Sequence, residues 1–201
     1  MKKILVIISS VLFMSVVQAK TISQYENEAE QNNPDSAYKA ALAYEFGVEG
    51  QVNKNENKSI RYYTIAHQGG NIRATSRLGV SYYNKKQYQE AIKYFKIGAT
   101  KNEALSQAYL GKILEQNNKI ESALKFYRSS VQSGNPYGKM FLGEYLIKSS
   151  DKGSDDFLEG YGLLLSANKK NKEAKKIIDK YPYKFTSKEQ QKLIKFMNNY
   201  N

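Results

Sequence analysis

The stretch from Asn71 to Gly134, NIRATSRLGVSYYNKKQYQEAIKYFKIGATKNEALSQAYLGKILEQNNKIESALKFYRSSVQSG, contains the same pattern twice. Leu78-Gly79 and Leu110-Gly111 are 32 residues apart, and so are Ala91 and Ala123, each of which precedes an aromatic pair. Self-similarity with a period in the thirties is typical of stacked helix-turn-helix units, which cannot bury their apolar faces alone. The stretch therefore predicts an all-α, right-handed α-solenoid of about four such repeats with terminal capping helices.

The pattern continues on both sides of this stretch. Ala41 and Gly143 take the position of the first glycine, and Ser59 and Gly160 take the position of the first alanine. The distance between the two landmarks is 18 and 17 residues in these outer units instead of 12, which predicts a longer polar loop in each. We expect repeats at 35–70, 71–102, 103–135 and 136–168.

The two ends of the chain predict caps for this stack. Residues 20–34 contain a short acidic helix, which we interpret as an N-terminal capping helix. Residues 169–201 form a basic segment that we interpret as a C-terminal capping hairpin. Its first helix should end near Lys180, and Thr186 with Glu189 three residues later is a capping-box signature for the second helix.

Small residues recur where the two helices of each hairpin should meet. Gly or Ala at positions 41, 79, 111 and 143 is expected to let the second helix approach the first closely. The aromatic pairs, Tyr94-Phe95 and Phe126-Tyr127, are expected to fill the space between neighbouring repeats. Most of the 17 tyrosines are interpreted as packing residues of this kind.

The first 19 residues have the form of a secretory signal. Lys2 and Lys3 precede an apolar run from Ile4 to Val17, and Ala19 ends a suitable cleavage site. The run is short against the roughly 20 residues that span a bilayer, so we expect no integral membrane segment in the mature chain. The sequence has no cysteine, which excludes lipidation and disulfides. We predict a periplasmic or secreted protein, cleaved after Ala19.

Positive charge is concentrated near the end of the chain. The formal net charge of +12 would fall to +10 without Lys2 and Lys3. Residues 168–201 hold ten lysines against three acidic residues. This excess favours an acidic protein partner or an anionic surface, although Lys-rich faces are often only solvated. Nucleic acid is not expected, because arginine is scarce and an exported protein rarely meets nucleic acid.

The sequence offers little for catalysis. His67 is the single histidine, so neither a Ser-His-Asp triad nor a metal site of histidines and cysteines can be assembled. Phosphate-binding glycine loops are absent as well. We expect no cofactor, no metal and no enzymatic activity.

The chain resembles the tetratricopeptide superfamily, and more closely its bacterial Sel-one-like branch, over about residues 35–168. The first repeat carries the Sel-one-like pattern in Ser36, Ala40-Ala41, Tyr44, Gly47, Ser59, Tyr62-Tyr63, Ala66 and Gly69. The next two carry the plain tetratricopeptide pattern in Leu78-Gly79, Tyr82, Ala91, Phe95 and Gly98, and in Leu110-Gly111, Ala123, Tyr127 and Ser130. The tryptophan usual in the family is missing.

The resemblance implies a protein-binding scaffold or adaptor whose first helices line a concave face. The alternative is an immunity or inhibitor protein that neutralises a toxin effector or a cell-wall enzyme. The positions that line the face in the family correspond here to Asp35, Tyr38, Glu45, Arg73, Ser76, Tyr83, Asn84, Lys112, Glu115, Gln116, Tyr137, Glu144 and Lys148. Of these, Tyr38, Arg73, Tyr83 and Tyr137 are the preferred anchors, since Tyr and Arg are enriched in binding hot spots. Ordinary solvent-facing residues would also fit these positions, and the basic end from Lys169 to Lys195 is the other candidate surface.

Overall fold

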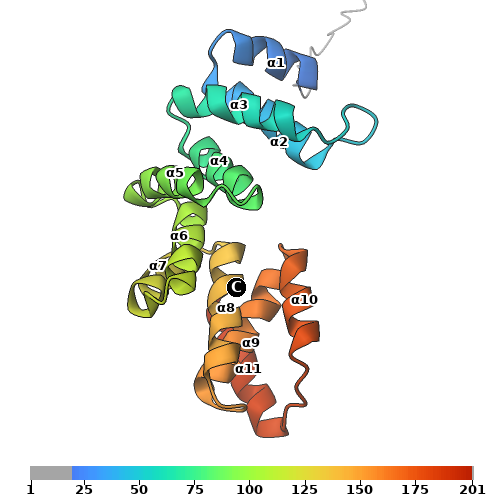
Figure 1. Cartoon of the computed structure of the whole chain (residues 1–201). Helices are drawn as coiled ribbons and strands as arrows, with labels where there is room; N and C mark the ends of the chain where they lie inside the picture. Colours follow the sequence, from blue (N-terminus) through green and yellow to red (C-terminus); the bar gives the residue numbers. More distant parts are fainter. Residues whose placement is uncertain (1–19, 201) are drawn as a thin grey trace, which may run out of the picture.

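The computed structural model describes residues 20–200, and this part of the chain forms eleven α-helices. The predicted signal peptide lies outside the described residues. The helices are α1 (Ile22–Glu30), α2 (Pro34–Phe46), α3 (Glu56–Gln68), α4 (Ile72–Asn84), α5 (Tyr88–Thr100), α6 (Ala104–Gln116), α7 (Ile120–Gln132), α8 (Pro136–Ser149), α9 (Asp155–Asn168), α10 (Lys172–Lys180) and α11 (Ser187–Asn199). They follow one another along a curved stack (Figure 1). The prediction of an all-α solenoid is confirmed.

Four helical hairpins make up the body of the stack. Helix α2 packs on α3, α4 on α5, α6 on α7, and α8 on α9. The loops inside the first and fourth hairpins, residues 47–55 and 150–154, are longer than the three-residue turns inside the second and third. None of the helices in the described part is long and apolar enough to cross a membrane.

The first helix of each hairpin begins at a residue whose side chain caps it. Asn33, Asn71 and Asn135 accept hydrogen bonds from backbone N–H groups in the first turn, and Glu103 does the same for α6. These side chains satisfy donors that the helix itself leaves unpaired. The caps lie 32 residues apart from Asn71 onward, so the period of the sequence becomes the period of the helix starts.

Residues with a positive φ, the left-handed backbone conformation, lie at equivalent positions in the turns between helices. Gly70, Asn102 and Gly134 precede α4, α6 and α8 by the same distance and have φ values of 85°, 56° and 71°. Inside the short hairpins, Lys86 (φ 61°) occupies the position that Asn118 (φ 57°) occupies one repeat later. Glycine and asparagine adopt this conformation at low cost, whereas lysine is an unusual choice.

The glycines predicted to lie between the helices do so. A Cβ atom on Gly79 would come within 2.5 Å of the Phe95 ring, and one on Gly111 within 2.7 Å of the Tyr127 ring. In the fourth hairpin, a Cβ on Gly143 would lie 2.8 Å from the carbonyl oxygen of Gly160. The second, third and fourth hairpins are therefore packed more closely at these points than a larger residue would permit, whereas the first hairpin has Ala41 there.

Only the second member of each aromatic pair is buried. Phe95 and Tyr127 are fully buried, whereas Tyr94 and Phe126 are partly exposed. Phe95 packs on Gly79 of its own hairpin and stacks at 5.1 Å on Tyr109 of the next one. Tyr94, although partly exposed, also packs between repeats, with its ring 5.3 Å from that of His67 in the preceding hairpin.

The first helices approach one another across the repeats. Helix α6 contacts both α4 and α8, and α10 contacts α8. These helices therefore line the inner side of the curved stack, and their exposed positions, together with those of α2, are called the inner surface below.

The ends of the stack are closed by additional helices. Helix α1 packs mainly on α2, whereas α10 and α11 both pack on α9. Lys139 and Ser166 donate hydrogen bonds to the carbonyl oxygen of Tyr200, which holds the end of α11 against the fourth hairpin. The C-terminal segment is thus built around α9, and the capping box of Thr186 and Glu189 is present at the start of α11.

The buried residues form two cores. The N-terminal core extends from Ala29 to Leu78 and consists largely of alanine and tyrosine. The C-terminal core extends from Val80 to Leu193 and is rich in leucine and phenylalanine. The two meet within α4, where Tyr82 packs against both.

Candidate protein-binding surface

A recess lies between α2 and α4 at the N-terminal end of the inner surface. It has a volume of about 520 Å³, and three of the predicted residues, Asp35, Tyr38 and Arg73, line it. Asp35 is tied to the capping residue of α4, since Asn71 Nδ2 donates to Asp35 Oδ1 at 3.0 Å. The structure thus brings these predicted residues together, and Lys39 and three neighbours, Leu42, Asn71 and Ile72, complete the lining.

The recess has an apolar floor and a cationic rim. Tyr38 and Leu42 are partly buried, whereas Lys39 and Arg73 are exposed. The Lys39 ammonium lies 5.2 Å from the centre of the Tyr25 ring. Arg73 is within 4.0 Å of no carboxylate in the described part of the chain. Its guanidinium is therefore available to a partner.

Farther along the inner surface, an ion pair joins α2 to α4. Arg77 Nη1 lies 3.0 Å from Glu45 Oε1, and the two side chains are 21% and 25% exposed. Glu45 also accepts a hydrogen bond from the hydroxyl of Tyr63. Burial lowers the pKa of Arg77, but the Glu45 carboxylate and the neighbouring phenols together outweigh burial, so this pKa is raised. Glu45 is thus held in the wall of the surface and is not free to bind a partner alone.

An aromatic cluster forms the middle of the inner surface. Tyr109 lies at its centre, with ring centroids 5.2 Å from Tyr83, 5.5 Å from Tyr137 and 5.3 Å from Phe141. Burial raises the pKa of Tyr109, and the neighbouring phenols add to the shift. Tyr83 and Tyr137 are only partly buried, so these two predicted anchors are the members of the cluster that reach the surface.

A charged network follows on α6 and α8. The Lys112 ammonium lies 3.3 Å from Glu115 and 3.4 Å from Glu144, which in turn accepts from Lys148 at 2.5 Å. Glu115 also accepts from the Tyr127 hydroxyl at 2.5 Å. Burial raises the pKa of Glu144, but Lys148 and Lys112 outweigh it, so this pKa is lowered. These four predicted residues satisfy one another across two repeats.

Ser76 is a correction to the predicted surface. Its side chain is fully buried, lies 2.7 Å from Ser106 Oγ, and donates to Glu103. Gly98 of α5 lies against both serines, and a Cβ atom there would come within 1.9 Å of Ser106 Oγ and 3.0 Å of Ser76 Oγ. Because Gly98 has no side chain, Ser106 of α6 can pack close to Ser76 and cover it. The two remaining predicted residues are exposed: Asn84 at the end of α4, and Gln116, which donates to the Tyr83 hydroxyl at 3.2 Å.

Arg77 and Tyr109 were not among the predicted residues. Each lies two positions before the glycine of its helix, and Phe141 holds the same place on α8. The repeat itself could have indicated this position, because it carries a long side chain in three consecutive first helices.

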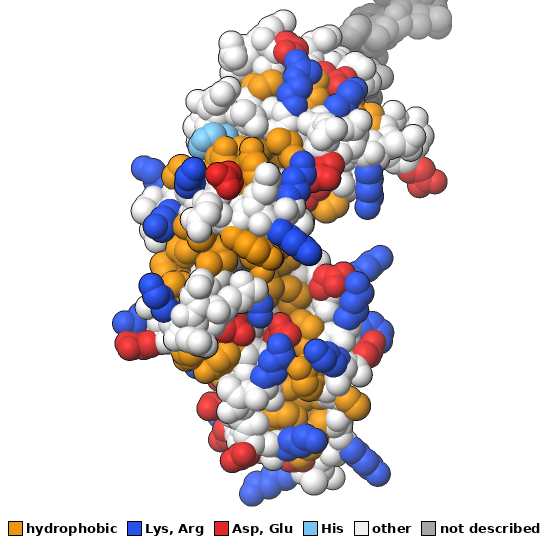
Figure 2. Space-filling view, viewed as in Figure 1, with side chains coloured by type: hydrophobic (Ala, Val, Ile, Leu, Met, Phe, Trp, Pro, Cys, Tyr) orange, Lys and Arg blue, Asp and Glu red, His pale blue; other side chains and the backbone are white. Residues whose placement is uncertain are grey.

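Figure 2 shows how these groups are distributed on one face of the molecule. Hydrophobic side chains gather in the middle of the view, and Lys, Arg, Asp and Glu side chains surround them. The outline is hollowed on the right, between the first repeats and α10. The arrangement suits recognition of another polypeptide, which requires an apolar centre within a polar rim.

Residues 20–200 contain no group of three His, Cys, Asp or Glu side chains that could hold a metal ion. His67 lies between the first two hairpins, with Nδ1 2.8 Å from Thr75 Oγ1 and its ring 5.3 Å from that of Tyr94. It contributes to packing between repeats.

Solved structures resemble this chain in fold. A protective antigen of uropathogenic Escherichia coli, c5321, which displays an SLR fold, aligns at 25% identity with a TM-score of 0.66 over 89% of this chain and 40% of its own. A Sel1 repeat protein from Oxalobacter formigenes aligns at 20% identity with a TM-score of 0.63 over 88% and 75%. The chain thus spans less than half of the Escherichia coli protein. The sequence matches no protein-family model and no curated protein. The structure is that of a Sel1-like repeat solenoid.

Proposed function

We propose that this Sel1-like repeat solenoid is a non-enzymatic scaffold that binds another protein through its inner surface. The observation that carries the proposal is the recess between α2 and α4, where Lys39 and Arg73 flank an apolar floor. Arginine beside tyrosine is a frequent combination in binding hot spots. The partly exposed Tyr83 and Tyr137 extend the apolar region toward the middle of the stack.

The charge network supports a preformed surface. Glu45, Arg77, Lys112 and Glu144 are held by contacts between neighbouring repeats, so their side chains lose little freedom when a partner binds. Preorganisation of this kind lowers the entropic cost of association. We further propose that the protein acts after export, in the periplasm or outside the cell, as the form of residues 1–19 suggests.

The test is capture of a partner by the chain from Lys20 onward, immobilised and exposed to a periplasmic extract. A double variant, Lys39→Ala with Arg73→Ala, removes the cationic rim of the recess without touching buried groups. The matched control, Lys96→Ala with Lys101→Ala, removes two exposed lysines at the second helix of a hairpin. Tyr83 is less suitable for such a test, because its truncation would also disturb Tyr109.

We expect a protein identified by mass spectrometry to be retained by the control and lost by the recess variant. Equal retention by both variants, with helical circular dichroism unchanged, would show that the recess is not the binding site. A single partner held tightly enough to suppress a toxic or lytic activity would assign an immunity or inhibitor role instead of an adaptor role.

A further inference from the structure

Helix α10 starts in the same way as the first helices of the four hairpins. Asn171 caps it through its side chain, as Asn71 caps α4 and Asn135 caps α8. Ala174, three residues after the cap, is fully buried, and so is Ala74 at the same distance from Asn71. A fifth repeat therefore begins at Asn171, although the sequence beyond Asn168 no longer shows the repeat pattern clearly.

Helix α10 also lies where a fifth first helix would lie. At its start, Asn171 Nδ2 is 3.4 Å from the Met140 sulfur on α8. Beyond its end, Tyr181 packs against the C-terminal core, to which Leu146 and Ile147 near the end of α8 belong. The two helices thus run side by side in the same direction, and α10 extends the inner surface by one helix.

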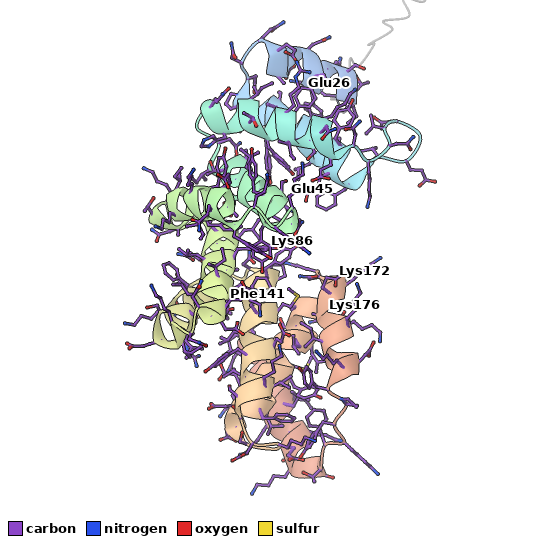
Figure 3. All side chains as sticks on the ribbon, viewed as in Figure 1. Glu26, Glu45, Lys86, Phe141, Lys172 and Lys176 are labelled. Carbon is purple, nitrogen blue, oxygen red and sulfur yellow. The ribbon has the colours of Figure 1, made fainter. Side chains whose placement is uncertain are left out.

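The exposed stripe of α10 can be read from the other first helices. The positions two and nine residues after the cap reach the surface as Tyr137 and Glu144 on α8, and they hold Glu173 and Lys180 on α10. The position five residues after the cap is buried on α8, where it is Met140, but exposed on α10, where it is Lys176. Figure 3 shows Lys172 and Lys176 on the same side of the molecule as Lys86, which follows α4. The inner surface therefore ends in lysines.

Two of the four lysines of α10 have no acidic partner among the described residues, whereas Lys175 pairs with Asp179 at 2.7 Å. Lys172 and Lys180 are within 4.0 Å of no carboxylate in residues 20–200. Lys176 pairs with Glu173 at 2.9 Å, but both side chains are more than half exposed, so this pair contributes little. By contrast, Glu45 and Glu144 are already paired with Arg77 and Lys112. The exposed lysines of α10 can therefore attract a negatively charged segment of another molecule.

We propose that α10 is the fifth inner helix and that Lys172, Lys176 and Lys180 bind an acidic segment of the partner protein. The proposal rests on the proposed function, since the same partner would contact the aromatic middle through Tyr83 and Tyr137. The partner segment would then combine Asp or Glu residues with large apolar ones. Attraction between opposite charges speeds encounter and fixes the orientation of the bound segment.

The probe is a set of random peptides displayed on phage and selected on the chain from Lys20 onward, followed by synthesis of the strongest binders with a fluorescent label. The test variant reverses Lys172, Lys176 and Lys180 to Glu. The control variant reverses Lys184, Lys188 and Lys195 to Glu, which makes the same charge change on exposed positions outside α10. Fluorescence anisotropy then gives the Kd of each peptide for the three proteins.

We expect the selected peptides to be enriched in Asp and Glu beside aromatic or aliphatic residues. The α10 variant should bind them at least about tenfold more weakly, which corresponds to about 1.4 kcal/mol, and the control should lose much less. The affinity for the unaltered chain should also fall as salt is added.

Four outcomes would overturn the inference. Peptides without acidic enrichment, or no enrichment at all, would exclude an acidic segment. Equal losses in both variants would assign the effect to overall charge. Binding of each protein to phosphatidylglycerol vesicles is measured as well. If the α10 variant loses vesicle binding but binds the peptides as the unaltered chain does, α10 would be assigned to a lipid surface. A captured partner that the α10 variant still holds, but the Lys39 and Arg73 variant does not, would sink this inference and leave the proposed function standing.

Discussion

Arg77 of α4 donates a hydrogen bond of 3.0 Å to Glu45 of α2, the residue 32 positions earlier in the sequence. Lys112 of α6 is joined to Glu144 of α8 over the same interval. The period that organises the hairpins therefore also places opposite charges on neighbouring first helices. These two ion pairs fix the angle between successive repeats on the inner side.

Removing one member of the first pair should destabilise the protein. Glu45→Gln leaves the Arg77 guanidinium partly buried without its carboxylate, and we expect a loss of about 1 to 3 kcal/mol in the free energy of unfolding. Urea unfolding followed by circular dichroism measures it. Glu121→Gln, which removes a carboxylate from an exposed pair with Lys125, should cost no more than about 0.5 kcal/mol. Equal effects of the two variants would contradict the structural role of Glu45.

The contact between Gly143 and Gly160 should tolerate no side chain. A Cβ on Gly143 would meet a backbone carbonyl oxygen, which cannot turn aside as a side chain can. Gly143→Ala should therefore cost about 1 to 3 kcal/mol, although alanine is the better helix former. The midpoint of thermal unfolding measures the loss. A midpoint equal to that of the unaltered chain would show that α8 and α9 are not so close.

The left-handed turn before α8 allows a matched pair of substitutions. Gly134 has a φ of 71°, and Asn102 adopts 56° at the equivalent place one repeat earlier. Gly134→Asn should change the stability by less than about 0.5 kcal/mol, whereas Gly134→Val should cost about 1 to 2 kcal/mol or more. Urea titrations of both variants test this. The expectation fails if valine is tolerated as well as asparagine.

Glu144 should make the stability depend on acid pH. Because its pKa is lowered in the folded protein, the carboxylate stabilises the fold above its usual value of 4.5, and this stabilisation is lost as the pH falls through the folded pKa. Glu144→Gln should be less stable than the unaltered chain at neutral pH, and the difference should shrink below about pH 4.5. Unfolding curves between neutral pH and pH 3 measure both. Curves that stay parallel over this range would refute the assignment.

The sequence predicted the fold best at the contacts between helices, where the close approach of two helices requires a small residue. Gly79 and Gly111 could be assigned to the contact between two helices because no other residue fits against Phe95 and Tyr127. The period of 32 residues followed directly from them, and with it the all-α solenoid.

The surface was harder to predict, because burial there depends on contacts between repeats. Ser76 looked solvent-facing on its own helix, but Ser106 of the next repeat covers it. Arg77 was not predicted, because its partner Glu45, 3.0 Å away, lies on the first helix of the preceding repeat. The sequence predicted α10 as a helix ending near Lys180 but not its place beside α8, because only Asn171 and Ala174 keep the pattern of the earlier repeats.

The division of the interior into an N-terminal and a C-terminal core bears on how the molecule opens. The N-terminal core, built mainly of alanine and tyrosine, buries less aliphatic surface than the leucine-rich C-terminal core. Units of a stack that touch only their neighbours can separate one from another, so amide hydrogens of α2 and α3 should exchange with solvent before those of α8 and α9. A polypeptide lying along the inner surface from the recess to α10 would bridge both parts. Binding of this polypeptide would couple the two cores, so that they would open together in a single cooperative transition.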